Sequence, residues 1–456
     1  MKKIAAVIAL FLFATLFVAY PTQYTYGQAA QPKNDSAPEL RNMFRDWLDA
    51  MKDAIKEDYY DSKYHGIDLD ARFNEAKAQI KSLNYDWQMF QVLAQVLMDF
   101  NDSHTYLVLP KRKDHFDYGF NMQIVGADCL VTAVTKGSDA EKAGLQVGDT
   151  IIRVGNIEPD RDNLWKILYV LYLTPPDTLE LTVRKDDSPE KTIKVKAKII
   201  TVKEYQEERK KQKEKERTYA ARCTEIDMET MACKLYTFNV EKSVIDKMMK
   251  IVAGHSKLIL DLRGNGGGLV SIEEYLTGYF FNRDLKMLDF VRRKKTEARV
   301  AKSKKEKAFN GELIVLVDSE SASASEVFAR VVQLEKRGKV IGDISNGFVM
   351  TSVRIALLRS QQRFGYNSIA YPLFISLSIG DVVMGDGGRL ERKGVIPDIP
   401  IIPTGSALKK QLDPVLAVAS TILGHKLSPE DAGKLQFMKE TTNGPFEIDT
   451  TELEKH

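Results

Sequence analysis

The sequence Asp261-Leu262-Arg263-Gly264-Asn265-Gly266-Gly267-Gly268 joins a predicted strand, Leu258–Leu262, to a predicted helix, Ser271–Phe281. Glycines let backbone N–H groups face a ligand without obstruction by side chains, and the N-terminus of a helix favours negative charge. The turn therefore suits either a phosphate or the oxyanion of an acyl-transfer reaction. The dinucleotide fingerprint is absent, because its third glycine would fall on Leu269. A tight turn without any ligand is the third interpretation.

A second strand-to-helix junction reads Asp318-Ser319-Glu320-Ser321-Ala322-Ser323-Ala324-Ser325-Glu326. It lies between a predicted strand, Leu313–Val317, and a predicted helix, Ser323–Leu334. A serine at the start of a helix can act as a nucleophile, because the helix dipole stabilises its alkoxide or a nearby oxyanion. Ser323 and Glu326 also have the spacing of a capping box, which by itself explains both residue types. Composition leaves these two interpretations open.

Three different patterns of apolar residues divide the chain. From about residue 220 to a predicted closing helix, Ala407–Leu423, strands alternate with helices, which predicts an α/β layered domain. Residues 38–100 have apolar positions at helical spacing, whereas residues 115–200 have short apolar runs separated by Gly, Asp and Pro. The former predicts helices and the latter a small β-rich module. Residues 203–217 carry twelve charges of mixed sign and predict a solvated helix or linker.

A nucleophilic serine needs a base, and the chain has six histidines. His104 is the candidate, because it lies in the loop Asp102-Ser103-His104-Thr105 between two structured blocks, where functional loops are usually found. Sequence spacing does not show that His104 meets Ser323, and polar surface is the alternative role for a histidine in a loop.

The N-terminus has the layout of a secretory signal peptide. Lys2 and Lys3 precede an uncharged, mostly apolar run, Ile4–Tyr20. We place the end of the signal at residue 29 and expect the remainder to be exported, either to the periplasm or outside the cell. A membrane anchor is the alternative if the signal stays uncleaved.

The cysteines are few. Cys223 and Cys233 flank a predicted hairpin tip, so a cross-strand disulfide and two buried free thiols are both compatible with their positions. Cys129 is predicted to be a core residue. Three cysteines are too few for a disulfide scaffold.

Charge and composition exclude several classes of protein. The 456 residues include 66 basic and 63 acidic side chains, so the chain lacks the positive excess that nucleic-acid binding needs. No Cys/His spacing or Walker-type loop predicts a metal or a nucleotide, and we expect no cofactor. Positive charge gathers in residues 292–307, which hold nine basic and two acidic side chains. These residues form either an exposed loop or a contact with an anionic surface or an acidic substrate.

Three ordered motifs resemble the carboxyl-terminal processing (tail-specific) family of serine proteases. They are the two junctions above and Gly394-Val395-Ile396-Pro397-Asp398-Ile399. Residues 115–200 resemble the family's PDZ domain, and the carboxylate-binding loop of that domain is similar to Tyr118, Gly119, Phe120, Asn121 and Met122. The resemblance covers about residues 40–425. It implies a crotonase-like (ClpP/crotonase-type) α/β spiral core with an inserted PDZ-like domain and an N-terminal helical segment.

The resemblance also implies roles for single residues. Ser323 would be the nucleophile, and the backbone amides of Ala324, Gly266 and Gly267 would be candidates for the oxyanion hole. Many members pair the serine with a lysine in a Phe-Gly-Lys-Gly stretch. Phe348 occupies that position here, and a phenyl ring cannot accept a proton.

A histidine replaces the lysine in the tricorn-like branch of the family. There the base lies in a Ser-His pair before the PDZ region, and a glutamate precedes the Gly-Val-x-Pro-Asp stretch; Ser103, His104 and Glu391 match these positions. The resemblance thus implies His104 as general base, oriented or assisted by Ser103 and Glu391. Lysine-dyad members also often carry a histidine in this loop, so a histidine here is not specific to the tricorn-like branch. The alternative is a pseudoprotease that has lost its base and only binds peptides. A third interpretation is a crotonase-fold protein that binds lipids or retinoids.

We therefore expect an exported serine endopeptidase that cleaves proteins or peptides near their C-termini through an acyl-enzyme on Ser323. The chain divides into a signal peptide (1–29), an N-terminal helical segment carrying Ser103 and His104 (35–112), a PDZ-like domain (113–200), a charged linker or helix (201–219), a catalytic domain (220–430) and a C-terminal tail (431–456).

Overall fold

The computed structural model describes residues 37–108, 114–185, 188–201, 203–204, 206–207, 219–357, 373–435 and 447–449. The predicted signal peptide and most of the charged linker lie outside these residues. Within the described ranges, no helix combines the length and apolar character needed to cross a bilayer.

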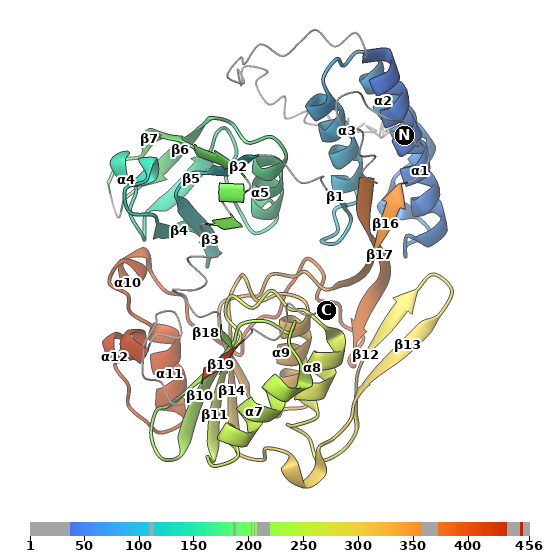
Figure 1. The fold of residues 1–456 in the computed structure, drawn as a ribbon. Coiled ribbons are helices and arrows are strands. Elements are labelled where there is room, and N and C mark those ends of the chain that lie inside the picture. The colour runs from blue at the N-terminus through green and yellow to red at the C-terminus, as the bar shows by residue number, and fades with distance from the viewer. Residues whose placement is uncertain are drawn as a thin grey trace, which may run out of the picture. The chain divides into compact units, whose positions relative to one another are not determined.

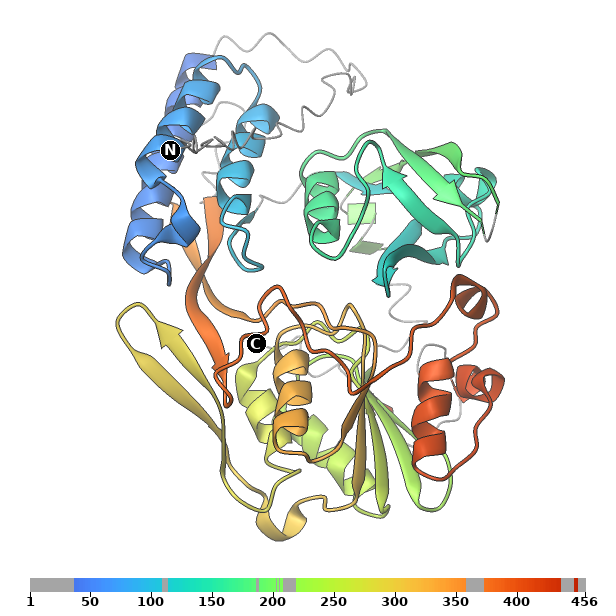
Figure 2. The same ribbon diagram turned by 180° about the vertical axis from the view of Figure 1, so that it is seen from behind.

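Three helices at the N-terminus pack on two strands that come from far along the chain (Figures 1 and 2). The helices are α1 (Ala37–Asp58), α2 (Leu69–Lys81) and α3 (Asp86–Met98), with a short 3-10 turn, η1 (Tyr64–Gly66). Their buried apolar side chains share one core with Leu357, Leu373, Ile375 and Leu377 of strands β16 (Met350–Leu357) and β17 (Leu373–Met384). The helical segment is therefore completed by strands from the C-terminal half of the chain.

The β-rich module is a sheet of five antiparallel strands in sequential order. The strands are β3 (Phe120–Val125), β4 (Asp128–Val134), β5 (Thr150–Val154), β6 (Thr178–Arg184) and β7 (Lys191–Lys196), with helices α4 (Asp139–Lys142) and α5 (Leu164–Leu173). A separate pair, β2 (Asp114–Asp117) and β8 (Lys198–Thr201), brings the two ends of the module together. Residues alternate between buried and exposed along β7, as expected for a sheet with one covered face.

The C-terminal half is built on a sheet of seven strands in the order β18-β15-β14-β11-β10-β9-β19. The five strands from β10 to β18 are parallel. Strand β9 runs antiparallel to β10, and β19 runs antiparallel to β9 and therefore in the same direction as the five. The bounds are β9 (Tyr219–Glu225), β10 (Thr230–Leu235), β11 (Lys257–Asp261), β14 (Glu312–Val317), β15 (Lys339–Gly342), β18 (Ile399–Pro400) and β19 (Glu447–Asp449). The predicted tail thus contributes a strand to this sheet.

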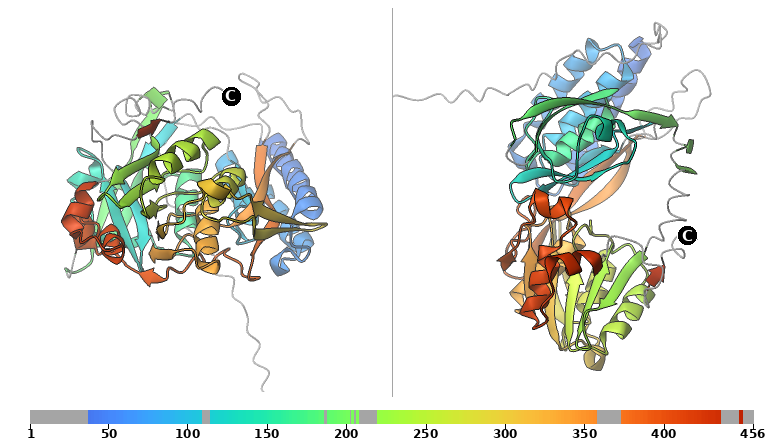
Figure 3. Two further views of the ribbon diagram at one scale, coloured as in Figure 1. Left: turned by 90° about the horizontal axis from the view of Figure 1, so that it is seen from below. Right: turned by 90° about the vertical axis from the view of Figure 1, so that its left-hand side faces the viewer.

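Helices cover both faces of the parallel strands (Figure 3). One face carries α7 (Lys242–Val252), α8 (Val270–Thr277) and α9 (Ala324–Leu334), and the other carries α11 (Pro414–Ile422) and α12 (Pro429–Leu435). In β14, Leu313 and Val315 lie in the first core and Ile314 and Leu316 in the second. Burial on both sides explains the uninterrupted apolar run of this strand.

A second sheet links the helical segment to the core. It contains β1 (Tyr106–Val108), β17, β12 (Leu285–Arg292) and β13 (Thr296–Ala301), with β16 also paired to β17. Much of the basic stretch 292–307 lies here and in the short turn η2 (Lys305–Lys307), and several of its cations have acidic partners in the chain. Arg292 and Lys295 pair with Glu297, and Arg299 pairs with Glu274.

Two predictions about helices need correction. The expected helix Ala407–Leu423 is two helices, α10 (Gly405–Lys409) and α11, because Pro414 cannot continue a helix. Asp413 instead caps the new helix by accepting a hydrogen bond from the N–H of Leu416 at 2.9 Å. The helix expected over Ser271–Phe281 is α8, which ends at Thr277.

The cysteine alternatives are resolved by strand register. Cys223 of β9 lies directly opposite Cys233 of β10, and the two form a disulfide. Cys129 is a buried free thiol in β4, as predicted.

Candidate active site

Ser323 occupies a constrained turn between β14 and α9. Its φ of 56° and ψ of −116° place a non-glycine residue in a sparsely populated region, at a cost of about 1–3 kcal/mol. Ser323 is partly exposed, whereas Ala322, Ala324 and Ser325 around it are buried. The strained turn therefore presents one serine from an otherwise buried segment.

The glycine turn packs against this serine. A Cβ added to Gly267 would lie 2.7 Å from Ser323 Cβ, so only glycine allows the approach. The fully buried Asn265 binds the two turns together: its backbone carbonyl accepts from the N–H of Ala322 at 3.0 Å and from Ser325 Oγ at 2.8 Å. The side chain of Asn265 also accepts from the N–H of Gly267 at 2.9 Å.

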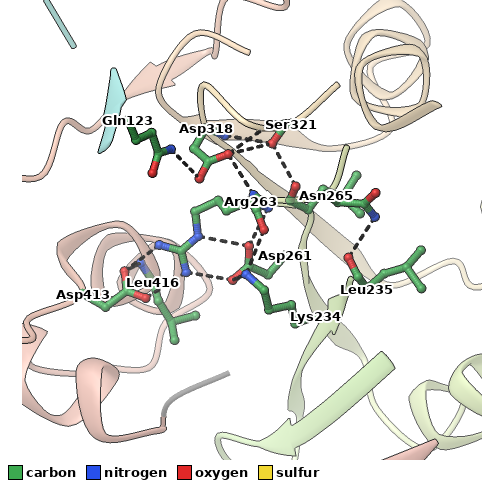
Figure 4. A network of polar contacts seen from close by, with 12 residues as sticks. Gln123, Lys234, Leu235, Asp261, Arg263, Asn265, Asp318, Ser321, Asp413 and Leu416 are labelled. Atoms are coloured by element: carbon green, nitrogen blue, oxygen red, sulfur yellow. Dashed lines mark hydrogen bonds and ion pairs between the residues drawn. The ribbon is translucent and has the colours of Figure 1, made fainter. Parts of the chain in front are cut away.

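A charged network under the turn ties it to the rest of the core (Figure 4). The guanidinium of Arg263 donates to both Asp261 and Asp413, with N···O distances of 2.8–3.0 Å. Burial alone would raise the pKa of Asp261, but Arg263 and Lys234 hold that pKa below its usual range. Asp318 accepts from the N–H of Gly264 at 2.9 Å and so joins the two junctions directly.

The three backbone amides expected to form an oxyanion hole differ in whether their N–H groups already have a hydrogen-bond partner. Gly267 donates its N–H to Asn265, so it is not an available donor, contrary to the prediction. Across the described ranges, the N–H groups of Gly266 and Ala324 have no hydrogen-bond partner, which leaves both available to a ligand. Unpaired amides beside a nucleophile are what stabilisation of an oxyanion requires.

Ser103, His104 and Glu391 form one hydrogen-bonded chain. Ser103 Oγ donates to Glu391 Oε2 at 2.9 Å and lies 2.6 Å from His104 Nδ1. Because the hydroxyl has one proton and gives it to the carboxylate, Nδ1 must carry the proton that it donates to Ser103 Oγ. His104 Nε2 then keeps its lone pair, which is the form that a general base needs.

The surroundings of this chain favour a neutral imidazole. Burial lowers the pKa of His104 below its ordinary value, against the opposing effect of the Asp102 carboxylate. Burial also raises the pKa of Glu391, although the N–H groups of Val349 and Ser103 act in the opposite direction. Burial of His104 thus favours the neutral imidazole, which is the form that can accept a proton.

Two carboxylates hold consecutive residues of the loop that contains Phe348. The fully buried Glu326 accepts from the N–H groups of Ser323, Gly347 and Phe348 at 2.7–2.9 Å. Glu391 accepts from the next N–H, that of Val349, at 2.8 Å. Within the described parts of the chain no hydrogen bond joins Ser323 to His104; catalytic contacts are often long in the absence of substrate.

Phe348, which the resemblance places where many family members have a lysine, has a packing role. Its ring lies 6.1 Å from that of Trp165 on α5, edge to face, and the Arg392 guanidinium lies over both rings at 5.8 and 5.5 Å. The position thus links the loop at 345–349 to the helix of the β-rich module and supplies no group that titrates.

The expected peptide-binding loop lies at the start of β3. Phe120 and Asn121 pair with β4, Tyr118 donates its hydroxyl to the carbonyl of Pro176, and Gly119 adopts a φ of 73°. The N–H of Gly119 donates to Asp117 at 2.8 Å, so this amide is already occupied.

A pocket runs between β3, α5 and the residues that precede Ser323. Its walls include Met122, Ile124, Leu164, Trp165, Ser319 and Phe348. Ser319 donates to the carbonyl of Ile124 at 2.5 Å, and Gln123 donates to Asp318 at 3.2 Å. The groove between strand and helix in the β-rich module therefore opens beside the Ser323 turn.

Three contributors to the site were not predicted in these roles. Glu326 was explained as a cap, and its hydrogen bonds from the N–H groups of Gly347 and Phe348 became visible only in three dimensions. Asn265 and Asp102 lie inside motifs that were singled out, but their buried contacts have no signal in a single sequence.

Comparisons with known proteins give one match over the layered α/β core and another over the β-rich module. Residues 226–401 match peptidase family S41 and residues 130–185 match a PDZ domain. A probable CtpA-like serine protease of Staphylococcus haemolyticus is 28% identical over 292 residues, which are 63% of this chain and 53% of that protein. One from Staphylococcus aureus (strain COL) is 25% identical over the same shares. The chain spans about half the length of these curated relatives.

Solved structures share the fold at low identity. Mature CPAF matches with a TM-score of 0.60 and 12% identity, covering 81% of this chain and 94% of that one. The photosystem II D1 C-terminal processing protease matches with a TM-score of 0.51 and 18% identity, covering 81% and 97%.

Proposed function

Because this chain belongs to the carboxyl-terminal processing family of serine proteases, peptidase family S41, we propose that it is an exported serine endopeptidase that cleaves substrates near their C-termini. The observation that carries the proposal is the chain of Glu391, Ser103 and His104, whose hydrogen bonds leave His104 Nε2 as an acceptor. A histidine base accounts for a family member with Phe348 in place of the lysine.

In the proposed reaction Ser323 Oγ attacks the scissile carbonyl carbon while His104 Nε2 takes the hydroxyl proton. The amides of Gly266 and Ala324 stabilise the tetrahedral oxyanion. The C–N bond then breaks as His104 returns the proton to the leaving amine. Water hydrolyses the acyl ester with the same base, and Ser323 is regenerated.

The preference for C-termini rests on the PDZ domain. Such domains bind an extended peptide end by strand addition, and here the groove between β3 and α5 borders Ser319 and Phe348. A peptide held in it would approach the Ser323 turn. Export rests on the signal-like residues 2–20. We also propose the crotonase-like spiral for the core, since its parallel strands are covered by helices on both faces.

Labelling with a fluorophosphonate probe tests the proposal. The protein should label and should cleave an unstructured protein substrate, and Ser323→Ala should abolish both. His104→Ala should reduce labelling at least 100-fold. A peptide with a free carboxylate should be cleaved faster than its C-terminal amide, which tests the PDZ contribution separately. Absence of labelling in the folded wild-type protein would instead indicate the peptide-binding pseudoprotease.

A further inference from the structure

Asp102 is a buried carboxylate at the base of the His104 loop, and the proposed reaction does not yet use it. Its side chain is 1% exposed. Oδ1 accepts from the N–H groups of His104 and Thr105 at 3.0 and 2.7 Å and from Ser378 Oγ at 2.7 Å. Oδ2 accepts from the hydroxyl of Tyr59 at 2.8 Å. All four partners are neutral donors, and no ion pair reaches Asp102 within the described residues.

These donors come from three distant parts of the chain. Tyr59 follows α1, Ser378 lies in the middle of β17, and Thr105 precedes β1. A further hydrogen bond from the N–H of Tyr60 to the carbonyl of Ser378, at 3.1 Å, holds the same elements together. Asp102 therefore anchors the loop that carries His104 where the helical segment meets the second sheet, while Glu391 holds the same loop through the N–H of Ser103 at 2.8 Å.

We propose that Asp102 is a positioning residue for the catalytic base: its carboxylate fixes the backbone of His104 and supplies the buried negative charge that stabilises the imidazolium formed during the reaction. The inference rests on the proposed role of His104. Removing one acceptor would free two backbone N–H groups of the loop at once. A fixed negative charge in a dry site also interacts strongly with a developing positive charge.

Other groups around this carboxylate have different roles. Burial raises the pKa values of Tyr59 and Tyr60 well above their ordinary range, so both remain neutral hydrogen-bond donors in any practical assay. Glu391 faces His104 through Ser103, and Asp381 is paired with Arg389. Asp102 is thus the carboxylate that bonds directly to the backbone of the base, and its charge raises the pKa of His104 against the effect of burial.

The test compares Asp102→Asn with Ser378→Ala in pH profiles of kcat/KM for a peptide substrate. Asn keeps the shape and the acceptor but removes the charge, so the pKa of His104 should fall. The acid limb should move to lower pH by about 1 unit, and kcat should decrease about 10- to 100-fold. Ser378→Ala removes one neutral donor and keeps the charge, so its acid limb should stay at the wild-type pH.

Four results would overturn the inference. One is a folded Asp102→Asn protein with the wild-type acid limb, and another is an equal shift in Ser378→Ala. If Asp102→Asn does not fold, a double variant, Tyr59→Phe with Ser378→Ala, should lower kcat at least tenfold without lowering the acid limb; an unchanged kcat would refute the positioning role. His104→Ala separates the two proposals: full activity there removes both, whereas an inactive His104→Ala beside an unaffected Asp102→Asn removes only this one.

Discussion

Substitution of Gly267 by alanine should displace Ser323, which lies on the neighbouring turn. Gly267 has a φ of 92°, and its added Cβ would lie 2.7 Å from Ser323 Cβ and 2.8 Å from the carbonyl oxygen of Ala322. Contacts become ordinary only at 3.4 Å, so the two turns must separate by several tenths of an ångström. Neither obstacle is the end of a flexible side chain that could move aside.

The size of the effect follows from two costs. An alanine forced into this backbone region costs about 1–3 kcal/mol, and overpacking costs about 1–3 kcal/mol more. We expect the free energy of unfolding to fall by the sum of the two costs, roughly 2–6 kcal/mol. Because displacement of a reacting group by about 1 Å can cost 100-fold in rate, the rate of fluorophosphonate labelling of Ser323 should fall by about two orders of magnitude.

Gly387→Ala is the matched control. Gly387 has a φ of 78° but no atom within 4 Å of its added Cβ, so alanine there meets the strain without the clash. It should lose only about 1–2 kcal/mol of stability and should label at close to the wild-type rate. Urea unfolding and labelling kinetics measure the two quantities. The reasoning is refuted if Gly267→Ala labels like Gly387→Ala.

Two further predictions concern stability. Replacing Cys223 and Cys233 together by serine should lower the free energy of unfolding by roughly 2–3 kcal/mol, because their disulfide closes a loop with a sequence separation of 10. Dithiothreitol should destabilise the wild type by a similar amount and leave the double variant unchanged in urea titrations; equal sensitivity of both would count against the disulfide. Burial raises the pKa of Glu273 to about 8, and a hydrogen bond from Thr277 at 3.0 Å only partly offsets it. A raised carboxyl pKa gives stability that is complete below the unfolded value near 4.5 and is lost as pH rises towards 8, by up to about 1.4 kcal/mol per unit. Glu273→Gln should remove this component of the pH dependence, and parallel curves for the two proteins would contradict the assigned cause.

The sequence alone was sufficient for the layered core and the β-rich module. Strand β14 and the two junctions were recognisable because apolar periodicity and turn residues are local properties. The boundary of the helical segment was harder. Its core needs Leu373 and Ile375, which lie nearly 300 residues away, and no local pattern carries that information.

For the site, the residue types could be named but their connections could not. Ser103, His104 and Glu391 were expected from the resemblance, and the fold brings them into hydrogen-bond contact across 288 positions of sequence. The same level of reasoning erred at Gly267, whose amide faces Asn265. Which of several adjacent N–H groups stays unpaired depends on a few tenths of an ångström in the packing of two turns.

What the sequence determined by itself was therefore the chemistry available: a serine before a helix, a glycine-rich turn, a histidine in a loop and a phenylalanine where a lysine would be expected. The tertiary structure alone decided which of these groups share hydrogen bonds, that Cys223 lies opposite Cys233, and that Asp102 and Glu326 are buried acceptors beneath the reactive segments. The physical reason is that burial and hydrogen bonding of polar groups are set by contacts between segments far apart in the chain, whereas strand, helix and turn preferences are set by neighbours.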